Sequence, residues 1–150
     1  MRIVLQKVSQ ASVTVDSQII SNIKHGYMLL VGISIDDTIE DIKKLSNKVL
    51  TLRLYDKDDT MWRQNIQEAK GEILSVSQFT LYARTKKGTK PDFHLAQKGH
   101  IANELYKEFL IQLRAKLGDT NVQDGEFGAM MSCNLTNEGP VTIILDSNSS

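Results

Sequence analysis

The apolar run YMLLVGI, residues 27–33, decides the fold of this chain. Its seven residues have the length of a strand and lack the three- and four-residue spacing of an amphipathic helix. A continuous apolar run of this kind is typical of a strand that is covered on both faces. We therefore expect it to lie inside a sheet, with other elements packed against it.

The segments before this run have the pattern of a strand pair. Residues 3–8 and 11–15 alternate apolar and polar side chains and are rich in β-branched residues, and residues 18–23 follow after a short Asp16-Ser17 turn. Period-two alternation places one face of a strand toward the core, and a two-residue turn joins antiparallel neighbours tightly. The first part of the chain therefore predicts a hairpin.

Two helices are predicted from apolar spacing. Asp36-Asp37-Thr38 is a good helix start, and apolar residues at three- and four-residue spacing follow from Ile39 to Leu50. A longer pattern runs from about Leu95 to Leu117 and is ended by a glycine. Between the two helices, residues 56–59 are predicted to be a polar loop.

The remaining apolar segments are predicted to be strands. Residues 73–76 follow Gly71, and residues 130–135 and 141–145 are joined by the turn-like stretch 136–140. Strands first, interleaved helices and strands again predict an α/β architecture of mixed, largely antiparallel sheets with two main helices packed on them.

Size and composition favour one domain over residues 1–150, because a chain of 150 residues that is 41% hydrophobic can bury a sizeable core. We expect the polar residues 147–150 to be a frayed tail. The 18 lysines and arginines balance the 18 aspartates and glutamates, so the net charge does not indicate a nucleic-acid partner.

The cellular location is predicted from the lack of a signal peptide, of a membrane span and of an intrachain disulfide. The start of the chain lacks the long apolar core of a signal peptide, and no segment approaches the roughly 20 apolar residues of a membrane span. The single Cys133 cannot form an intrachain disulfide. We therefore expect a cytoplasmic protein without membrane contact.

Residue spacing argues against several kinds of site. The three histidines show no metal-binding spacing and no glycine-rich nucleotide loop occurs, so we expect neither metal nor cofactor. Cys133 lies in an apolar segment and is expected to be a buried, inert thiol. His94 and His100 flank the start of the long helix, where exposed or capping roles are common.

Two polar stretches remain unexplained by packing: SVSQFTLYA, residues 75–83, and NEGPVT, residues 137–142. In the first, Ser77 and Thr80 either satisfy backbone groups at a strand end or face a ligand. In the second, the Gly-Pro pair is either an ordinary turn or part of a site. Spacing alone leaves both alternatives open.

Together, the two stretches resemble the signature motifs of the D-aminoacyl-tRNA deacylases, also called D-tyrosyl-tRNA deacylases. The matching residues are SQFTL at 77–81 and NxGPVT at 137–142. The opening residues 1–15, the loop GTKPDF at 88–93 and EFGA at 126–129 are also similar, so motifs run along nearly the whole chain.

The resemblance implies a homodimeric proofreading enzyme that hydrolyses the ester between a D-amino acid or glycine and the 3′ end of a tRNA. Ser77, Gln78, Phe79 and Thr80 would form the pocket floor of one subunit. Gly139 and Pro140 of the partner chain, in a cis peptide, would form the opposing wall, and this wall would exclude L-amino acids.

The resemblance also assigns supporting roles. Lys7 occupies a position that often holds arginine and is associated with the wall, Met131 would pack beneath the wall, and Asn137 belongs to the wall motif. Lys90 likewise replaces a frequent arginine in its loop, and both lysines lack the planar fork of a guanidinium. Independently of the resemblance, the basic cluster next to the SQFTL motif is either a solvated loop or a set of tRNA contacts; it consists of Arg84, Lys86, Lys87 and Lys90.

Three interpretations of the function remain open from the sequence: two enzymatic mechanisms and a binding role. Backbone N–H groups of Phe79 and Thr80 would stabilise the oxyanion while the substrate 2′-hydroxyl helps activate water. Alternatively, Thr80 or Ser77 is the nucleophile of a general esterase. The third possibility is a tRNA-binding module without enzymatic activity.

Overall fold

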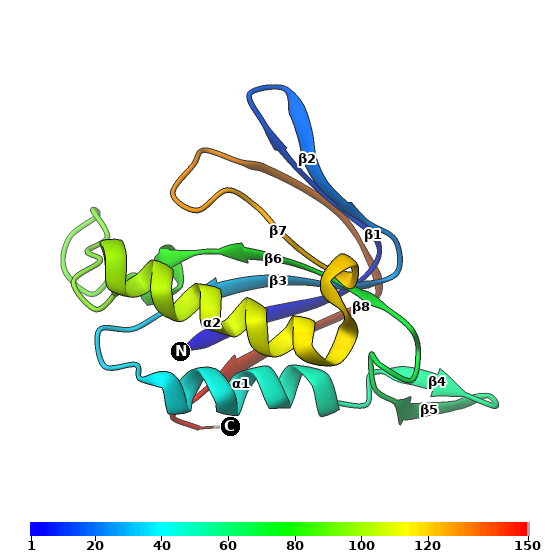
Figure 1. Ribbon diagram of the computed structural model, residues 1–150. Coiled ribbons are helices and arrows are strands. Elements are labelled where there is room, and N and C mark those ends of the chain that lie inside the picture. Colours follow the sequence, from blue (N-terminus) through cyan, green and yellow to red (C-terminus); the bar gives the residue numbers. More distant parts are fainter. Residues whose placement is uncertain (150) are drawn as a thin grey trace.

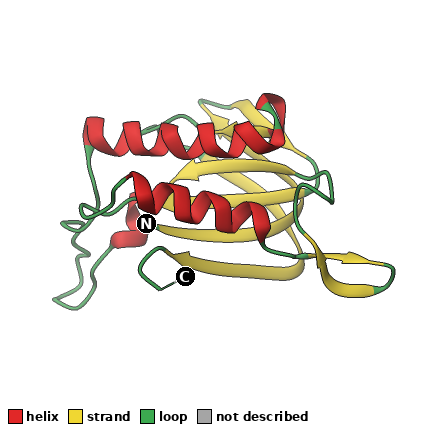
Figure 2. Cartoon of the chain, turned by 60° about the horizontal axis from the view of Figure 1, so that its bottom comes forward, coloured by secondary structure: helices red, strands yellow, loops and turns green. Residues whose placement is uncertain are grey.

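Two helices cover one face of a six-stranded sheet, and a separate two-stranded hairpin projects beside them (Figure 1). The computed structural model describes residues 1–149. The turned view shows both helices on the same side of the sheet (Figure 2). The strands are β1 (Arg2–Val15), β2 (Gln18–Ile23), β3 (Gly26–Gly32), β4 (Tyr55–Lys57), β5 (Thr60–Gln64), β6 (Glu72–Ser77), β7 (Val122–Asp124) and β8 (Ser132–Asp146). The predicted mixed α/β architecture with two main helices is confirmed.

The long strand β1 organises the sheet because it pairs with three other strands. Its first half runs antiparallel to β3 and its second half antiparallel to β2, while β8 pairs along its other edge. Asp16 and Ser17 have φ of 48° and 66°, the left-handed backbone that tight hairpin turns require. The predicted hairpin is therefore confirmed.

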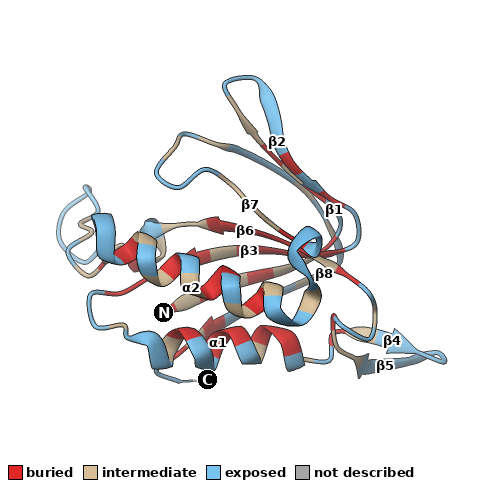
Figure 3. Ribbon diagram, in the orientation of Figure 1, coloured by how far each residue is buried: buried red, intermediate tan, exposed pale blue. Residues whose placement is uncertain are grey.

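Strand β3, the predicted central strand, lies between β1 and β6, and it is parallel to β6. Six of its seven residues are buried, as expected for a strand covered on both faces (Figure 3). Its helix-facing side chains join the larger core, and the other face contributes Met28 to a second core together with Leu74 and Val76 of β6.

Both helices form where the spacing predicts them. Helix α1 (Ile39–Thr51) begins after Thr38, whose N–H donates to Asp41 Oδ2 at 2.8 Å, and it buries Ile42, Leu45 and Val49. Helix α2 (Gly99–Leu117) starts four residues later than the apolar pattern suggests. The reason is that the preceding residues bond as an extended segment, with Gln97 N–H donating to the carbonyl of Ile33 at 2.8 Å.

The predicted polar loop at 56–59 is instead part of the β4–β5 hairpin, with Asp58 and Asp59 at its turn. Both strands are short, and all but Tyr55 and Gln64 are exposed. Without a buried face, the sequence carries no alternation that would indicate a strand.

The C-terminal strands, predicted as two, are one strand, β8, whose pairing with β1 is interrupted by a bulge. Gln6 pairs with Thr142 and Val8 pairs with Asn137, so the four residues 138–141 lie opposite Lys7 alone. Proline lacks the N–H that a ladder needs, so the predicted turn is accommodated as a bulge within the strand.

The tail is ordered further than its composition suggests. The Ser147 side chain is buried, and its hydroxyl accepts a hydrogen bond from the Met1 ammonium at 2.9 Å. Lys44 Nζ also donates to the Ser147 carbonyl at 2.6 Å. The predicted frayed end at Ser150 lies outside the described residues.

Within residues 1–149, neither of the two α-helices is long and apolar enough to cross a bilayer.

Helix α2 offers a matched test of how the helices are held to the sheet. Leu113 is fully buried in the larger core, whereas Ile111 is 57% exposed on the same helix. We expect Leu113→Ala to lower the free energy of unfolding by about 2–5 kcal/mol, because it opens a cavity. Ile111→Ala should change it by no more than about 0.5 kcal/mol. Urea unfolding measures both, and equal losses would contradict this packing.

Candidate functional site

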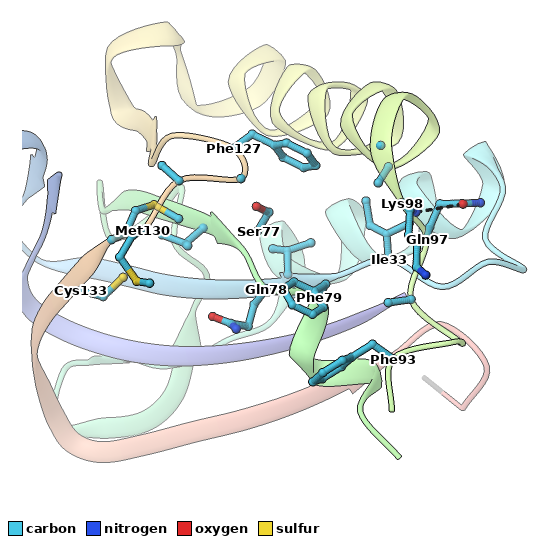
Figure 4. A pocket seen from close by; sticks show the side chains of 18 residues that line it. Ile33, Ser77, Gln78, Phe79, Phe93, Gln97, Lys98, Phe127, Met130 and Cys133 are labelled. Atoms are coloured by element: carbon cyan, nitrogen blue, oxygen red, sulfur yellow. Dashed lines mark hydrogen bonds between the residues drawn. The ribbon is translucent and has the colours of Figure 1, made fainter. Parts of the chain in front are cut away.

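A cavity of about 810 Å³ opens where β3 and β6 end, and it is the candidate site (Figure 4). Its floor comes from the strand ends, its roof from the start of α2 and one side from the segment before β8. Most of its lining is apolar. The lining residues are Val31, Ile33, Val76, Ser77, Gln78, Phe79, Phe93, Ala96, Gln97, Lys98, Gly99, Ala102, Phe127, Gly128, Ala129, Met130, Met131 and Cys133.

The floor forms because β6 ends abruptly after Ser77. Gln78 N–H donates to the carbonyl of Val31 at 2.7 Å, and the chain then turns into a short 3₁₀ helix, η1 (Phe79–Tyr82). The first N–H groups of a helix have no acceptor within it. The N–H groups of Phe79 and Thr80, predicted at a strand end, therefore lie at the start of this helix.

The side chains of the SQFT motif have different positions. Ser77, Gln78 and Phe79 line the cavity, whereas Thr80 does not. The Thr80 hydroxyl accepts a hydrogen bond from the Gln78 amide instead, and Thr80 is exposed.

One rim of the cavity is aromatic. The rings of Phe79 and Phe93 meet edge to face, with centroids 5.0 Å apart. Phe93 follows a loop that Arg84 and Asp92 close through two backbone hydrogen bonds and an ion pair of 3.0 Å. This basic loop, residues 85–91, carries the exposed lysines 86, 87 and 90 next to the rim.

The two histidines near α2 lie outside the cavity lining. His94 is exposed, with Nδ1 3.1 Å from Asp92 Oδ1. His100 is exposed in the first turn of α2. Both positions agree with the exposed roles expected from the sequence.

The roof and side of the cavity come from residues that spacing did not single out. Ala102 of α2 and Phe127 line it, and Met131 packs against Gly125. A Cβ at position 125 would lie 2.5 Å from Met131 Sδ, so the glycine allows this close approach. The available signal was the resemblance, which included EFGA at 126–129 and Met131.

Cys133 contradicts the expectation of a buried thiol, because it is exposed and lines the cavity. An apolar segment does not reveal which of its alternating side chains faces the core, and a shift of one residue reverses the two faces. Its surroundings still desolvate the sulfur in part, and this raises the pKa of the thiol.

The Gly-Pro segment lies apart from the cavity of its own chain. Gly139 and Pro140 are exposed in the β8 bulge, and their peptide bond is cis. Asn137 shapes the bulge, since its Oδ1 accepts from the Val141 N–H at 2.8 Å and its Nδ2 donates to Thr142 Oγ1 at 2.9 Å. None of these residues lines the cavity.

Lys7, which faces the bulge in the strand pairing, has an aromatic neighbour. Its Nζ lies 4.6 Å from the ring centroid of Tyr55, a cation–π distance. The pKa of Tyr55 is raised by burial and further by the charge of Glu138, so the bulge carboxylate also acts on this ring. Lysine, aromatic ring and carboxylate thus gather behind the Gly-Pro segment.

Across residues 1–149, no three histidine, cysteine or carboxylate side chains gather as the ligands of a metal ion.

Comparison with known proteins gives consistent matches along the chain. The family model for D-Tyr-tRNA(Tyr) deacylase matches residues 4–146. The D-aminoacyl-tRNA deacylase of Saccharomyces cerevisiae is 75% identical over 148 residues, covering 98% of this chain and 99% of the relative.

Two solved structures superpose closely. One, the c-Myc DNA unwinding element binding protein, has a TM-score of 0.92 and 42% identity, with coverage of 97% of this chain and 98% of the other. The second, a probable eukaryotic D-amino acid tRNA deacylase, has a TM-score of 0.83. The superposition covers 96% of this chain and 97% of the other. At 20% identity, this likeness shows the fold alone.

The position of Cys133 predicts an exposed but poorly reactive thiol. Because burial raises its pKa, less of the reactive thiolate forms at a given pH. We expect alkylation by iodoacetamide to be slower than for the urea-unfolded chain at the same pH, and its rate to rise at higher pH. A rate profile against pH for the folded and unfolded chains measures this, and identical profiles would contradict it.

Proposed function

This chain belongs to the D-Tyr-tRNA(Tyr) deacylase family and is an ester hydrolase acting on D-aminoacyl-tRNA, and we propose that two subunits share each of its active sites. We further propose that it removes glycine from alanine tRNA and spares L-aminoacyl-tRNA. The observation that carries the proposal is the separation, within one chain, of the SQFT floor from the Gly-Pro segment.

The floor suits ester hydrolysis because the N–H groups of Phe79 and Thr80 lie where a buried strand ends and a short helix begins. Attack of water on the ester carbonyl gives a tetrahedral oxyanion, and a fixed N–H donor stabilises such an intermediate by about 2.7–4 kcal/mol. The N–H groups of Phe79 and Thr80 are the proposed donors. The cavity of about 810 Å³ has room for an amino acid and the terminal nucleoside that carries it.

A second copy of the chain would supply the wall. Helices α1 and α2 cover one face of the sheet, while the other face displays Ile144, which is 72% exposed, beside its partner Val4 on β1. Burial of such apolar surface favours a symmetric dimer. In that dimer, Gly139 and Pro140 of the partner would close the open side of the cavity.

A backbone wall accounts for selection by chirality. If carbonyl groups hold the substrate α-amino group, the side chain of an L-amino acid points into the wall and is excluded. A D side chain points outward to solvent, and glycine has no side chain to collide. The site then accepts D-amino acids of different sizes without contacts to their side chains.

The nucleophile is best assigned to water. The Thr80 hydroxyl has Gln78 as its hydrogen-bond partner, and no histidine or carboxylate within residues 1–149 contacts it. Without such a base, a threonine hydroxyl is a weak nucleophile. We propose that the substrate 2′-hydroxyl helps activate water, whose oxygen bonds to the carbonyl carbon while the 3′ oxygen leaves with a proton.

Thr80→Ala separates this mechanism from that of a threonine esterase. We expect kcat/KM for D-tyrosyl-tRNA to stay within about tenfold of the unaltered enzyme, because the backbone donors remain. Loss of a nucleophile costs several orders of magnitude, so a drop of about a thousandfold or more would establish the esterase. Thr120→Ala, an exposed threonine outside the site, is the matched control.

The same assay tests the binding-module alternative. That alternative requires the unaltered chain to bind D-tyrosyl-tRNA without turnover, so substrate cleavage by the unaltered chain excludes it.

The basic loop beside the rim is proposed to contact tRNA phosphates. Lys86→Gln with Lys87→Gln should weaken tRNA binding and flatten the plot of log affinity against log salt, by about 0.7–0.9 per lost phosphate contact. Lys43→Gln with Lys107→Gln removes the same charge from exposed helix positions and should leave the slope unchanged. Equal slopes for both double variants would show that the loop lysines are only exposed to solvent and do not contact tRNA.

A further inference from the structure

We propose that Ser75 and Tyr106 are a positioning pair that holds the roof of the cavity over its floor. The inference rests on the proposed function, since it assigns to this pair the geometry of the same site. Neither residue lines the cavity, and both are buried behind it.

The pair is a direct link between strand β6 and helix α2. Ser75 Oγ and Tyr106 Oη are 2.9 Å apart, and the two residues are 0% and 3% exposed. Side chains alternate along a strand, so Ser75 and Ser77 lie on the same face of β6, toward α2. The bond therefore acts two residues before the chain leaves the strand to form the floor.

The same two residues also hold the side of the cavity. The Ser75 carbonyl accepts a hydrogen bond from Gly125 N–H at 3.2 Å. The Tyr106 ring lies 6.0 Å, centroid to centroid, from Phe127, and Ala102 of the roof stands one helical turn before Tyr106. Floor, roof and the 125–131 segment, which we call the side segment, thus meet at one buried bond.

A hydrogen bond between Ser75 and Tyr106 fixes the position of α2 relative to β6 more strictly than apolar packing does. Apolar contacts are non-directional, whereas this buried bond fixes both distance and angle. Burial raises the pKa of the Tyr106 hydroxyl, so the bond stays between neutral groups at working pH. The neighbouring side chains Leu74 and Val76 are apolar, which makes Ser75 the polar exception within the buried part of β6.

Tyr106→Phe removes the bond and keeps the ring. We expect kcat/KM for D-tyrosyl-tRNA to fall about ten- to a hundredfold, because small displacements in a site cost rates of this size. Tyr27→Phe is the matched control, since the Tyr27 hydroxyl is also buried but has no hydrogen-bond partner within residues 1–149. A change in rate that is no greater for Tyr106→Phe than for Tyr27→Phe would overturn the proposal.

The double variant Ser75→Ala with Tyr106→Phe separates positioning from stability. Removing both partners leaves no unpaired polar group, so thermal stability should recover toward that of the unaltered chain. A positioning role predicts that kcat/KM stays low despite this recovery. Recovery of kcat/KM together with stability would show a purely structural role and overturn the proposal.

Amide hydrogen exchange gives a readout that does not need the reaction. In Tyr106→Phe, exchange in the side segment and at residues 77–80 should be faster than in Tyr27→Phe, while α1 exchanges equally in both. Unchanged exchange in both segments would overturn the proposal. Absence of D-ester hydrolysis by the unaltered chain would instead contradict the proposed function, and the exchange result would still test the pair.

Discussion

The parallel pairing of β3 with β6 is the constraint on which the site depends. Both strands are buried, so their positions are fixed by packing on two faces. They end together, and the bond from Gln78 N–H to the Val31 carbonyl ends the ladder and turns the chain into η1. The N–H groups of Phe79 and Thr80, which we propose as oxyanion donors, thereby lie at the edge of a rigid core rather than on a loop.

The second half of the proposed site, the Gly-Pro segment, depends on an interruption of strand pairing rather than on regular pairing. The β8 bulge lets four residues oppose Lys7, and Asn137 bonds across the bulge so that Gly139 and Pro140 stand exposed with a defined shape. The helices occupy one face of the sheet (Figures 1 and 2), and the other face carries the exposed Ile144, where we propose that a second copy binds. In the proposed dimer, the floor and the wall lie on different elements of one small chain, and a second copy brings them together.

The sequence predicted those parts of the fold that long patterns encode. The apolar run 27–33 and the helical spacing of α1 and α2 reflect burial over many residues. The Gly-Pro stretch was predicted as a turn between two strands, and it is a bulge within one strand. Exposed elements without a buried face and features set by contacts distant in sequence were not predictable. The exposed β4–β5 hairpin has no alternation, and the facing of Cys133 depends on the register of β8 against β1. The bond between Ser75 and Tyr106 joins residues that are 31 positions apart.

Chiral selection by a shared site is the central claim, and one measurement tests it most directly. Purified protein is incubated with D-tyrosyl-, L-tyrosyl- and glycyl-tRNA, with and without a chelator, and the loss of each ester is followed. The account predicts rapid loss of the D and glycyl esters, survival of the L ester and no effect of the chelator. Equal loss of the D and L esters would contradict exclusion by the partner's Gly-Pro wall.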